Sequence, residues 1–239
     1  MKTKIKTILL ALTLLSSSSL LAENKALKQI IEKVPMLKNL NAKILEVKTH
    51  QSLHQFKVQV SQPRPGVFEG FITKDFKNIV IGQGFDANNG QPLLMPLPIN
   101  TKELKEISAY TLGNGKKEFF LFTDPECPYC HKLEKNLTSI KKDVKLYVIL
   151  YPLSFHKNAK SMSMYILSQN NNTTKAKAMK EIANGSKAYT EAKYSASDLE
   201  KYNKQIDASI ALVDKIGVRG TPTIVDSKGY RVSDLAVRD

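Results

Sequence analysis

Residues 119–134 of this 239-residue chain read FFLFTDPECPYCHKLE, and their pattern is that of a strand followed by a helix. Its apolar beginning is typical of a buried strand, which Asp124 and Pro125 end. A helical pattern follows from the cysteine pair, and a second apolar run over residues 145–151 predicts another strand. Strand, helix and strand at this spacing predict a βαβ unit, in which the helix covers a parallel pair of strands.

The chain has two cysteines, and they stand in the string Cys127-Pro128-Tyr129-Cys130 at the start of the predicted helix. The free N–H groups and the positive end of a helix stabilise a thiolate, and Pro128 suits a first helical turn because its missing N–H costs nothing there. We therefore expect Cys127 to be an exposed attacking thiol of low pKa. Cys130, one turn further along and more covered, would resolve the mixed disulfide.

Two other chemistries could use the same cysteines. His131 and His156 could complete a zinc site, but neighbouring side chains such as Cys130 and His131 point in different directions on a helix. The string C-x-x-C-H also attaches haem covalently, with Met162 or Met164 as a candidate axial ligand. Small haem-c domains are helical, whereas this string follows a strand. We expect no metal and no cofactor, with a c-type haem protein as the distant alternative.

A second constellation, Gly220-Thr221-Pro222-Thr223, follows a predicted helix over residues 206–216 and leads into a predicted strand. A proline behind a turn and at the start of a strand is a position where a cis peptide bond is tolerated. In that geometry the backbone of Thr221 would be free to pair with an extended substrate. The loop and the C-x-x-C helix together favour a thiol–disulfide exchange site.

The amino terminus has the pattern of a secretory signal peptide over residues 1–22. Three lysines precede the apolar run Ile8–Leu15, which is too short to span a bilayer, and Ala22 gives a cleavage site. We therefore expect the body of the chain to be exported to a compartment where disulfides persist.

Composition excludes one further class of function. The net charge is +14, but 32 of the 36 basic side chains are lysine and 4 are arginine. Recognition of phosphates and base edges favours the planar, bidentate arginine fork, so we expect no nucleic-acid partner.

The pattern along the chain predicts two domains. Alternating strands after residue 43 place an N-terminal domain at residues 23–100, and the βαβ unit places the second domain at residues 113–239. The stretch between them, residues 101–112, is expected to be a linker with a short helix. With 42 % hydrophobic residues, the chain can build a sizeable core.

Three stretches carry a family resemblance. FFLFTDPECPYCHKLE at residues 119–134 resembles the strand, active site and helix of the periplasmic disulfide isomerases of the DsbC and DsbG type, within the thioredoxin superfamily. IGVRGTPTIV at residues 216–225 is similar to the cis-proline loop of that family. FEGFITKDFKNIVIGQGFD at residues 68–86 resembles the hairpin of its N-terminal dimerisation domain.

The resemblance implies an α+β protein: a small cystatin-like α+β dimerisation domain, then a thioredoxin-like α/β domain with a helical insertion. It implies a V-shaped homodimer in the periplasm that reshuffles wrong disulfides in unfolded or misoxidised exported proteins and is recycled by the membrane reductant DsbD. An oxidase and a non-catalytic chaperone of the same fold are the alternatives. After Val232 only a single helical turn fits, where the family has a C-terminal helix.

The resemblance also implies roles for individual residues. The catalytic pair would be Cys127 and Cys130. The residues expected to bind the substrate are Pro128, Tyr129, Thr221 and Pro222.

Overall fold

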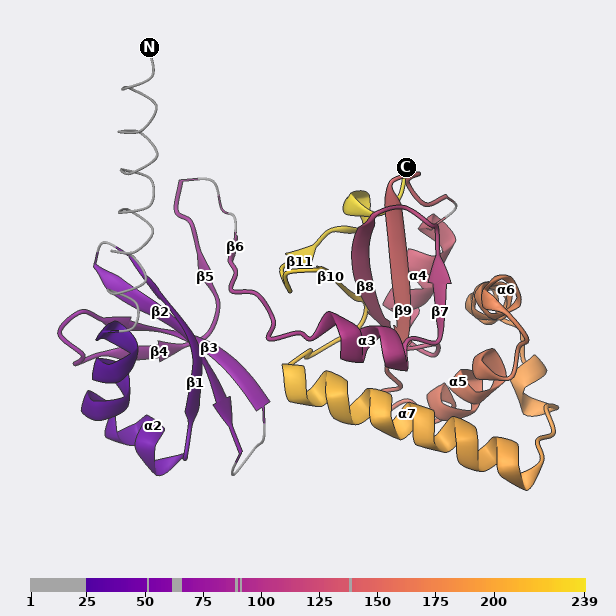
Figure 1. Ribbon diagram of the computed structural model, residues 1–239, viewed down its shortest axis with the longest axis horizontal. Helices are drawn as coiled ribbons and strands as arrows, with labels where there is room; N and C mark the ends of the chain where they lie inside the picture. Colours follow the sequence, from indigo (N-terminus) through magenta and orange to yellow (C-terminus); the bar gives the residue numbers. More distant parts are fainter. Residues whose placement is uncertain (1–24, 51, 62–65, 89, 91, 138) are drawn as a thin grey trace, which may run out of the picture. The chain divides into compact units, whose positions relative to one another are not determined.

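The computed structural model describes residues 25–50, 52–61, 66–88, 90, 92–137 and 139–239 (Figure 1). The chain divides into two units, with the junction between Met95 and Pro96. The predicted signal peptide, residues 1–22, lies outside the described residues. Within the described part, no helix is both long enough and apolar enough to cross a membrane.

The N-terminal unit is built on an antiparallel sheet of four strands in the order β1-β2-β3-β4. The strands are β1 (Lys43–Thr49), β2 (Leu53–Val60), β3 (Gly66–Thr73) and β4 (Ile79–Ile81). A helical segment over residues 25–33 and the short helix α2 (Pro35–Asn39) contribute Ile30 and Leu37 to a core with Phe56 and Val58 of β2. The alternation of apolar side chains in β2 therefore places one face of the sheet against these helices.

Polar side chains are buried on the opposite face of β2. Gln55 donates from Nε2 to the carbonyl oxygen of Leu93 at 2.8 Å, and Lys57 pairs with Glu69 at 3.5 Å. Leu93 belongs to β6 (Pro92–Leu93), which pairs with β5 (Gly84–Phe85) in a two-stranded ribbon. The polar bond to Gln55 ties this ribbon to the sheet.

The second unit is built on a five-stranded mixed sheet in the order β11-β10-β8-β9-β7. Its strands are β7 (Tyr110–Leu112), β8 (Lys117–Thr123), β9 (Val144–Leu150), β10 (Thr223–Asp226) and β11 (Arg231–Val232). β8 and β9 run parallel, with Phe120 opposite Tyr147, and the other pairs are antiparallel. The predicted parallel strand pair is confirmed, and β10 and β11 form an antiparallel hairpin.

Helices cover both faces of this sheet (Figure 1). They are α3 (Thr101–Ile107), α4 (Pro128–Asn136), α5 (Ala159–Leu167), α6 (Asn172–Ala183) and α7 (Ala196–Ile216). On one face, α3 and the C-terminal half of α7 pack on Phe120 and Phe122. On the other, α4, α5 and α6 pack around Leu121 and Val148. Successive side chains of β8 thus enter opposite cores, which explains the unbroken apolar run in the sequence.

The structure corrects the predicted linker over residues 101–112 and the domain end at residue 100. Leu104 of α3 is fully buried against the sheet, and Tyr110 of β7 pairs with Val148 of β9. These residues belong to the second unit, which begins at Pro96. The last helix also differs from the prediction, because α7 begins at Ala196 rather than near residue 206.

A single 3₁₀ turn, η2 (Asp234–Ala236), follows the last strand. Beyond it, Val237 is fully buried in the core that α4 and α6 share, and its carbonyl accepts from the Lys141 N–H at 3.0 Å. One turn therefore suffices to place an apolar side chain in this core.

Candidate active site

Helix α4 begins directly behind the buried strand β8. In the tight turn between them, the Cys127 N–H donates to the carbonyl oxygen of Asp124 at 3.1 Å. Cys127 is the N-cap residue of α4 with an extended backbone, and Pro128 occupies the first helical turn. The thiol of Cys127 therefore lies at the positive end of the helix, where free N–H groups stabilise an anion.

Both cysteines are free thiols, and both are buried. The prediction of an exposed Cys127 is wrong, because this residue is 4 % exposed, against 0 % for Cys130. The cover comes from the loop that precedes β10, where the Cys127 thiol donates to the carbonyl oxygen of Thr221 at 3.6 Å. Cys127 is nevertheless the more accessible of the two.

The pKa of the Cys130 thiol is raised to about 12, mainly by burial and to a smaller extent by the neighbouring Cys127. The hydroxyl groups of Thr123 and Thr221 lower this pKa. So does the Asp124 N–H, which donates to Cys130 Sγ at 3.4 Å. Cys130 is therefore a protonated thiol at neutral pH, held at the inner side of the helix.

The loop over residues 220–222 lies at the same edge of the sheet as the active-site turn. β10 runs beside β8 with Thr223 opposite Phe122, and the Thr221–Pro222 peptide bond is cis. The fold thereby brings Thr221 to Cys127 across a separation of 94 residues. Tyr129 is 75 % exposed, so its ring stands out into solvent rather than over the thiols.

A buried carboxylate, which the sequence analysis did not single out, holds the active-site turn. Asp124 is fully buried, and its carboxylate accepts from the Glu126 N–H at 2.8 Å, the Leu153 N–H at 2.7 Å and His156 Nδ1 at 2.8 Å. Leu153 and His156 lie in the connection between β9 and α5. This connection is therefore fastened to the turn that carries Cys127. An aspartate that ends a buried strand was the available signal, but its partners could not be read from the sequence.

Glu126, the residue before Cys127, also forms hydrogen bonds to the segment that precedes α5. Its carboxylate accepts from the backbone N–H of Asn158 at 2.6 Å and from Asn158 Nδ2 at 2.8 Å. Asn158 is the N-cap residue of α5, so the negative charge of Glu126 lies at the positive end of that helix. Both acidic residues of the turn thus bind the segment before α5.

One turn after Cys130, α4 carries a second buried acid, Glu134, which sequence reasoning also missed. Burial raises the pKa of this carboxyl to about 7, and the positive charge of Lys180 on α6 acts in the opposite direction. Glu134 Oε1 has no hydrogen-bond partner among the described residues, and neither does the buried hydroxyl of Tyr110. The charge of Glu134 contributes to raising the pKa of Tyr110.

The residues considered for metal or haem have other contacts. His131 Nε2 lies 2.6 Å from the carbonyl oxygen of Pro125, and Met162 is buried in the core beside α6, with Met164 packed against it. Among the described residues, no group of three or more His, Cys, Asp or Glu side chains could hold a metal ion.

Comparison with known proteins places these residues in a wider context. The family model described as "Thioredoxin-like domain" matches residues 104–235. The chain is 29 % identical over 147 residues to "Probable thiol:disulfide interchange protein DsbC" of Bordetella pertussis, an alignment that covers 61 % of this chain and 45 % of that protein. The chain thus spans less than half the length of this relative.

Two further comparisons have higher coverage. "Thiol:disulfide interchange protein DsbC" of Escherichia coli is 27 % identical over 172 residues, which cover 68 % of this chain and 66 % of that protein. A solved structure titled "Structural and functional characterization of Helicobacter pylori DsbG" matches 83 % of this chain and 99 % of its own, with 14 % identity and a TM-score of 0.39.

Proposed function

Because the chain belongs to the thioredoxin-like domain family, we propose that it is a thiol–disulfide exchange enzyme that reshuffles wrong disulfides in exported proteins. Cys127 is the attacking residue and Cys130 the resolving residue. The observation that carries the proposal is the contact of the Cys127 thiol, at the start of α4, with the backbone of Thr221 beside the cis peptide bond. A substrate chain paired with this backbone would present its disulfide at Cys127.

In the proposed reaction, the Cys127 thiolate attacks one sulfur of a substrate disulfide. The S–S bond breaks, a mixed disulfide forms, and the other substrate sulfur leaves as a thiolate. A second substrate thiolate then attacks the substrate sulfur of the mixed disulfide. This step forms a new substrate disulfide and returns the Cys127 thiolate without net transfer of electrons.

The competing step is attack by Cys130 on Cys127 Sγ, which releases the substrate thiol and leaves a Cys127–Cys130 disulfide. The thiolate is the nucleophile in this chemistry, and the pKa of about 12 keeps Cys130 protonated at neutral pH. Burial therefore delays the resolving step and gives the mixed disulfide time to reshuffle.

The wider setting of the proposal rests on the resemblance to the DsbC and DsbG type. Pro128, Tyr129, Thr221 and Pro222 bind the substrate, which is an unfolded or misoxidised exported protein. The enzyme is a homodimer in the periplasm, joined through its N-terminal unit, and the membrane reductant DsbD returns the cysteine pair to its reduced state.

Reactivation of scrambled, multi-disulfide ribonuclease tests the proposal. The wild-type protein restores ribonuclease activity in a thiol buffer, Cys127→Ala abolishes this, and Cys130→Ala retains reshuffling but accumulates mixed disulfides. A folded wild-type protein that oxidises reduced ribonuclease but leaves the scrambled form inactive would indicate an oxidase instead. If Cys127→Ala supported the folding of exported proteins in cells as well as the wild-type protein does, the protein would be a non-catalytic chaperone instead.

A further inference from the structure

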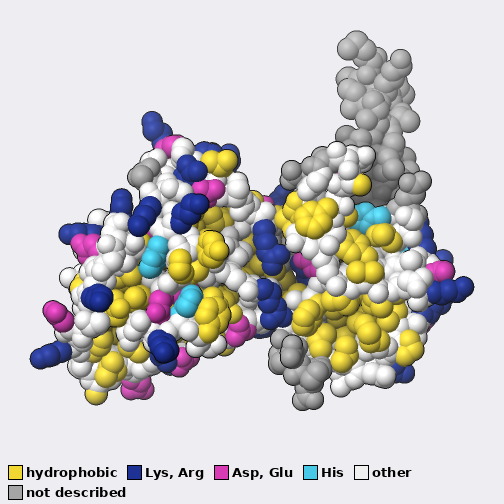
Figure 2. Space-filling model, turned by 180° about the vertical axis from the view of Figure 1, so that it is seen from behind, with side chains coloured by type: hydrophobic (Ala, Val, Ile, Leu, Met, Phe, Trp, Pro, Cys, Tyr) yellow, Lys and Arg dark blue, Asp and Glu magenta, His cyan; other side chains and the backbone are white. Residues whose placement is uncertain are grey.

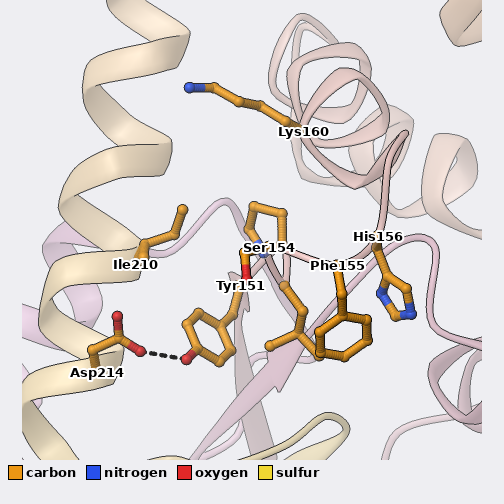
Figure 3. A pocket seen from close by; sticks show the side chains of 9 residues that line it. Tyr151, Ser154, Phe155, His156, Lys160, Ile210 and Asp214 are labelled. Carbon is orange, nitrogen blue, oxygen red and sulfur yellow. Dashed lines mark hydrogen bonds between the residues drawn. The ribbon is translucent and has the colours of Figure 1, made fainter. Parts of the chain in front are cut away.

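A pocket of about 350 Å³ opens beside the active-site turn (Figure 3). Its size falls at the lower end of the ~300–1,000 Å³ range of binding sites for small molecules. One wall is α7, and the other is the connection between β9 and α5. The residues that line the pocket include Tyr151, Phe155, His156, Lys160, Ile210 and Asp214.

The active-site turn fixes the position of one pocket wall. His156, on this wall, binds the buried Asp124 carboxylate, and Asp124 is joined to Cys127 by a tight turn with a hydrogen bond of 3.1 Å. The ends of such a turn lie less than about 7 Å apart. An extended chain advances about 3.3 Å per residue, so a substrate residue two or three positions from the attacked cysteine can reach this wall.

The chemistry of the walls favours an aromatic occupant. The ring of Phe155 is 71 % exposed and makes an edge-to-face pair with His156, with ring centroids 4.5 Å apart. Opposite it, Figure 3 shows Ile210 of α7 near the Tyr151 ring, whose hydroxyl donates to Asp214. Because that hydroxyl already has a partner, a ring entering between Phe155 and Ile210 leaves it satisfied.

Lys160 of α5 also lines the pocket, and in Figure 3 its ammonium end lies away from the rings of Tyr151 and Phe155. Lys160 pairs with Asp207 of α7 at 3.3 Å, and both side chains are about half exposed.

We propose that this pocket is a specificity subsite that receives an aromatic side chain of the substrate, two or three residues from the cysteine attacked by Cys127. The inference rests on the proposed exchange reaction and adds a preference among its substrates. Misoxidised proteins with an aromatic residue at this distance from a cysteine are attacked faster than those without one.

The test uses peptides with one cysteine in a mixed disulfide with 5-thio-2-nitrobenzoate. Reduced protein attacks the peptide sulfur, and release of the coloured thiolate gives a second-order rate constant. Alanine or phenylalanine occupies each position from three before to three after the cysteine. We expect phenylalanine to raise the rate about two- to tenfold at one or two of these positions, the effect of one aromatic contact.

Substitutions in the pocket test whether it is the source of the preference for phenylalanine. Phe155→Ala brings the phenylalanine-to-alanine rate ratio close to one, and so does Ser154→Trp, which fills the pocket from its rim. Leu235→Ala, which removes another apolar side chain of similar exposure from the same unit, keeps the wild-type ratio. Because both pocket positions are exposed, thermal unfolding and far-UV circular dichroism can establish that the variants fold.

Two outcomes would overturn the subsite. One is a wild-type rate that is equal for all peptides, and the other is a ratio that survives in both pocket variants. In either case, exchange with the all-alanine peptide leaves the proposed function standing. Absence of exchange with every peptide would instead contradict the proposed function itself.

Discussion

At the scale of single residues, the two thiols of one helix turn differ because of what surrounds them. Cys127 lies at the helix N-terminus with the Thr221 carbonyl as its partner, whereas Cys130 is enclosed and its pKa rises to about 12. A pair with equal surroundings would have no preferred attacking member. The proposed roles of Cys127 as attacking thiol and Cys130 as resolving thiol thus rest on their places in one helical turn and on the loop that covers Cys127.

The first residue-scale prediction concerns His156, a positioning residue that acts through Asp124. Removing its Nδ1–H in His156→Leu leaves the buried carboxylate short of one donor and loosens the turn that carries Cys127. We expect a loss of about 1–3 kcal/mol in the free energy of unfolding. We also expect slower alkylation of Cys127 by iodoacetamide at pH 7 in the folded protein.

His156→Asn provides the matched rescue, because its amide N–H can donate to the same carboxylate. It should restore most of the alkylation rate, and His50→Leu, in the other unit, should leave that rate at the wild-type value. A leucine variant that is destabilised yet alkylated at the normal rate would limit His156 to a structural role.

The second residue-scale prediction concerns Glu134, whose pKa is raised from 4.5 to about 7 by burial. Between these two values the folded state binds more protons than the unfolded state, so stability falls as pH rises through this window. The shift corresponds to about 3 kcal/mol, lost completely above pH 7. A glutamine at this position cannot ionise. The groups that interact electrostatically with position 134, Lys180 and Tyr110, are the same in the wild-type protein and in Glu134→Gln.

Urea unfolding at pH 4.5 and pH 8 measures this effect. Relative to the wild-type protein, Glu134→Gln should gain about 3 kcal/mol more at pH 8 than at pH 4.5. Glu181→Gln, which changes a half-exposed carboxylate on α6, should show no such difference. An equal gain at both pH values would mean that Glu134 titrates normally in the folded protein.

At the scale of elements, local sequence predicts what local interactions determine. The apolar run and the C-x-x-C start were sufficient to place β8, α4 and β9, because burial on both faces and a helix N-terminus leave clear patterns. β7 was missed because its three residues form a strand only by pairing with residues 146–148. The beginning of α7 was also missed, because the first half of this helix is polar and lacks the apolar periodicity of its second half.

In the candidate active site, too, some residues could be predicted from local sequence and others could not. Cys127, Cys130 and the Thr221–Pro222 loop have local sequence signals. The cover over Cys127 comes from a residue 94 positions away, and two of the three partners of the Asp124 carboxylate, Leu153 and His156, lie 29 and 32 positions away. Short motifs identify chemical groups, whereas their burial is set by tertiary packing.

The element-scale prediction concerns the end of α7, which sets the start of the loop that covers Cys127. Gly217 closes the helix in the left-handed region, with φ of 83°, and its N–H donates to Asp214 at 3.1 Å. Alanine in this conformation costs about 1–2 kcal/mol. Gly217→Ala should therefore lower the midpoint of urea unfolding.

Gly220→Ala is the comparison within the same loop. A Cβ atom at Gly220 meets nothing within 4 Å, and the residue lies outside the left-handed region. Its effect on stability should stay within about 0.5 kcal/mol. Equal destabilisation by the two substitutions would show that the loop, rather than the helix end, is sensitive to a Cβ atom.

At the scale of the whole molecule, the two units offer different kinds of surface. The family match covers residues 104–235 and so falls within the second unit, which contains both cysteines. The N-terminal unit has its own core and an edge strand, β4, on which Val80 is 63 % and Ile81 47 % exposed. Figure 2 shows hydrophobic side chains gathered over one face of this unit.

The proposed homodimer leads to the last prediction. An edge strand that exposes apolar side chains can pair with a strand of another chain, and a lysine on such an edge opposes that pairing. Light scattering should therefore give the wild-type protein twice the mass of one chain, and Val80→Lys the mass of one chain. Phe85→Lys, an equally exposed position on β5, should remain dimeric.

Because the cysteine pair lies in the other unit, Cys127 alkylation in Val80→Lys should proceed as in the wild type while ribonuclease reactivation falls. A monomeric wild-type protein, or a dimeric Val80→Lys variant, would contradict the assignment of β4 as the dimer edge.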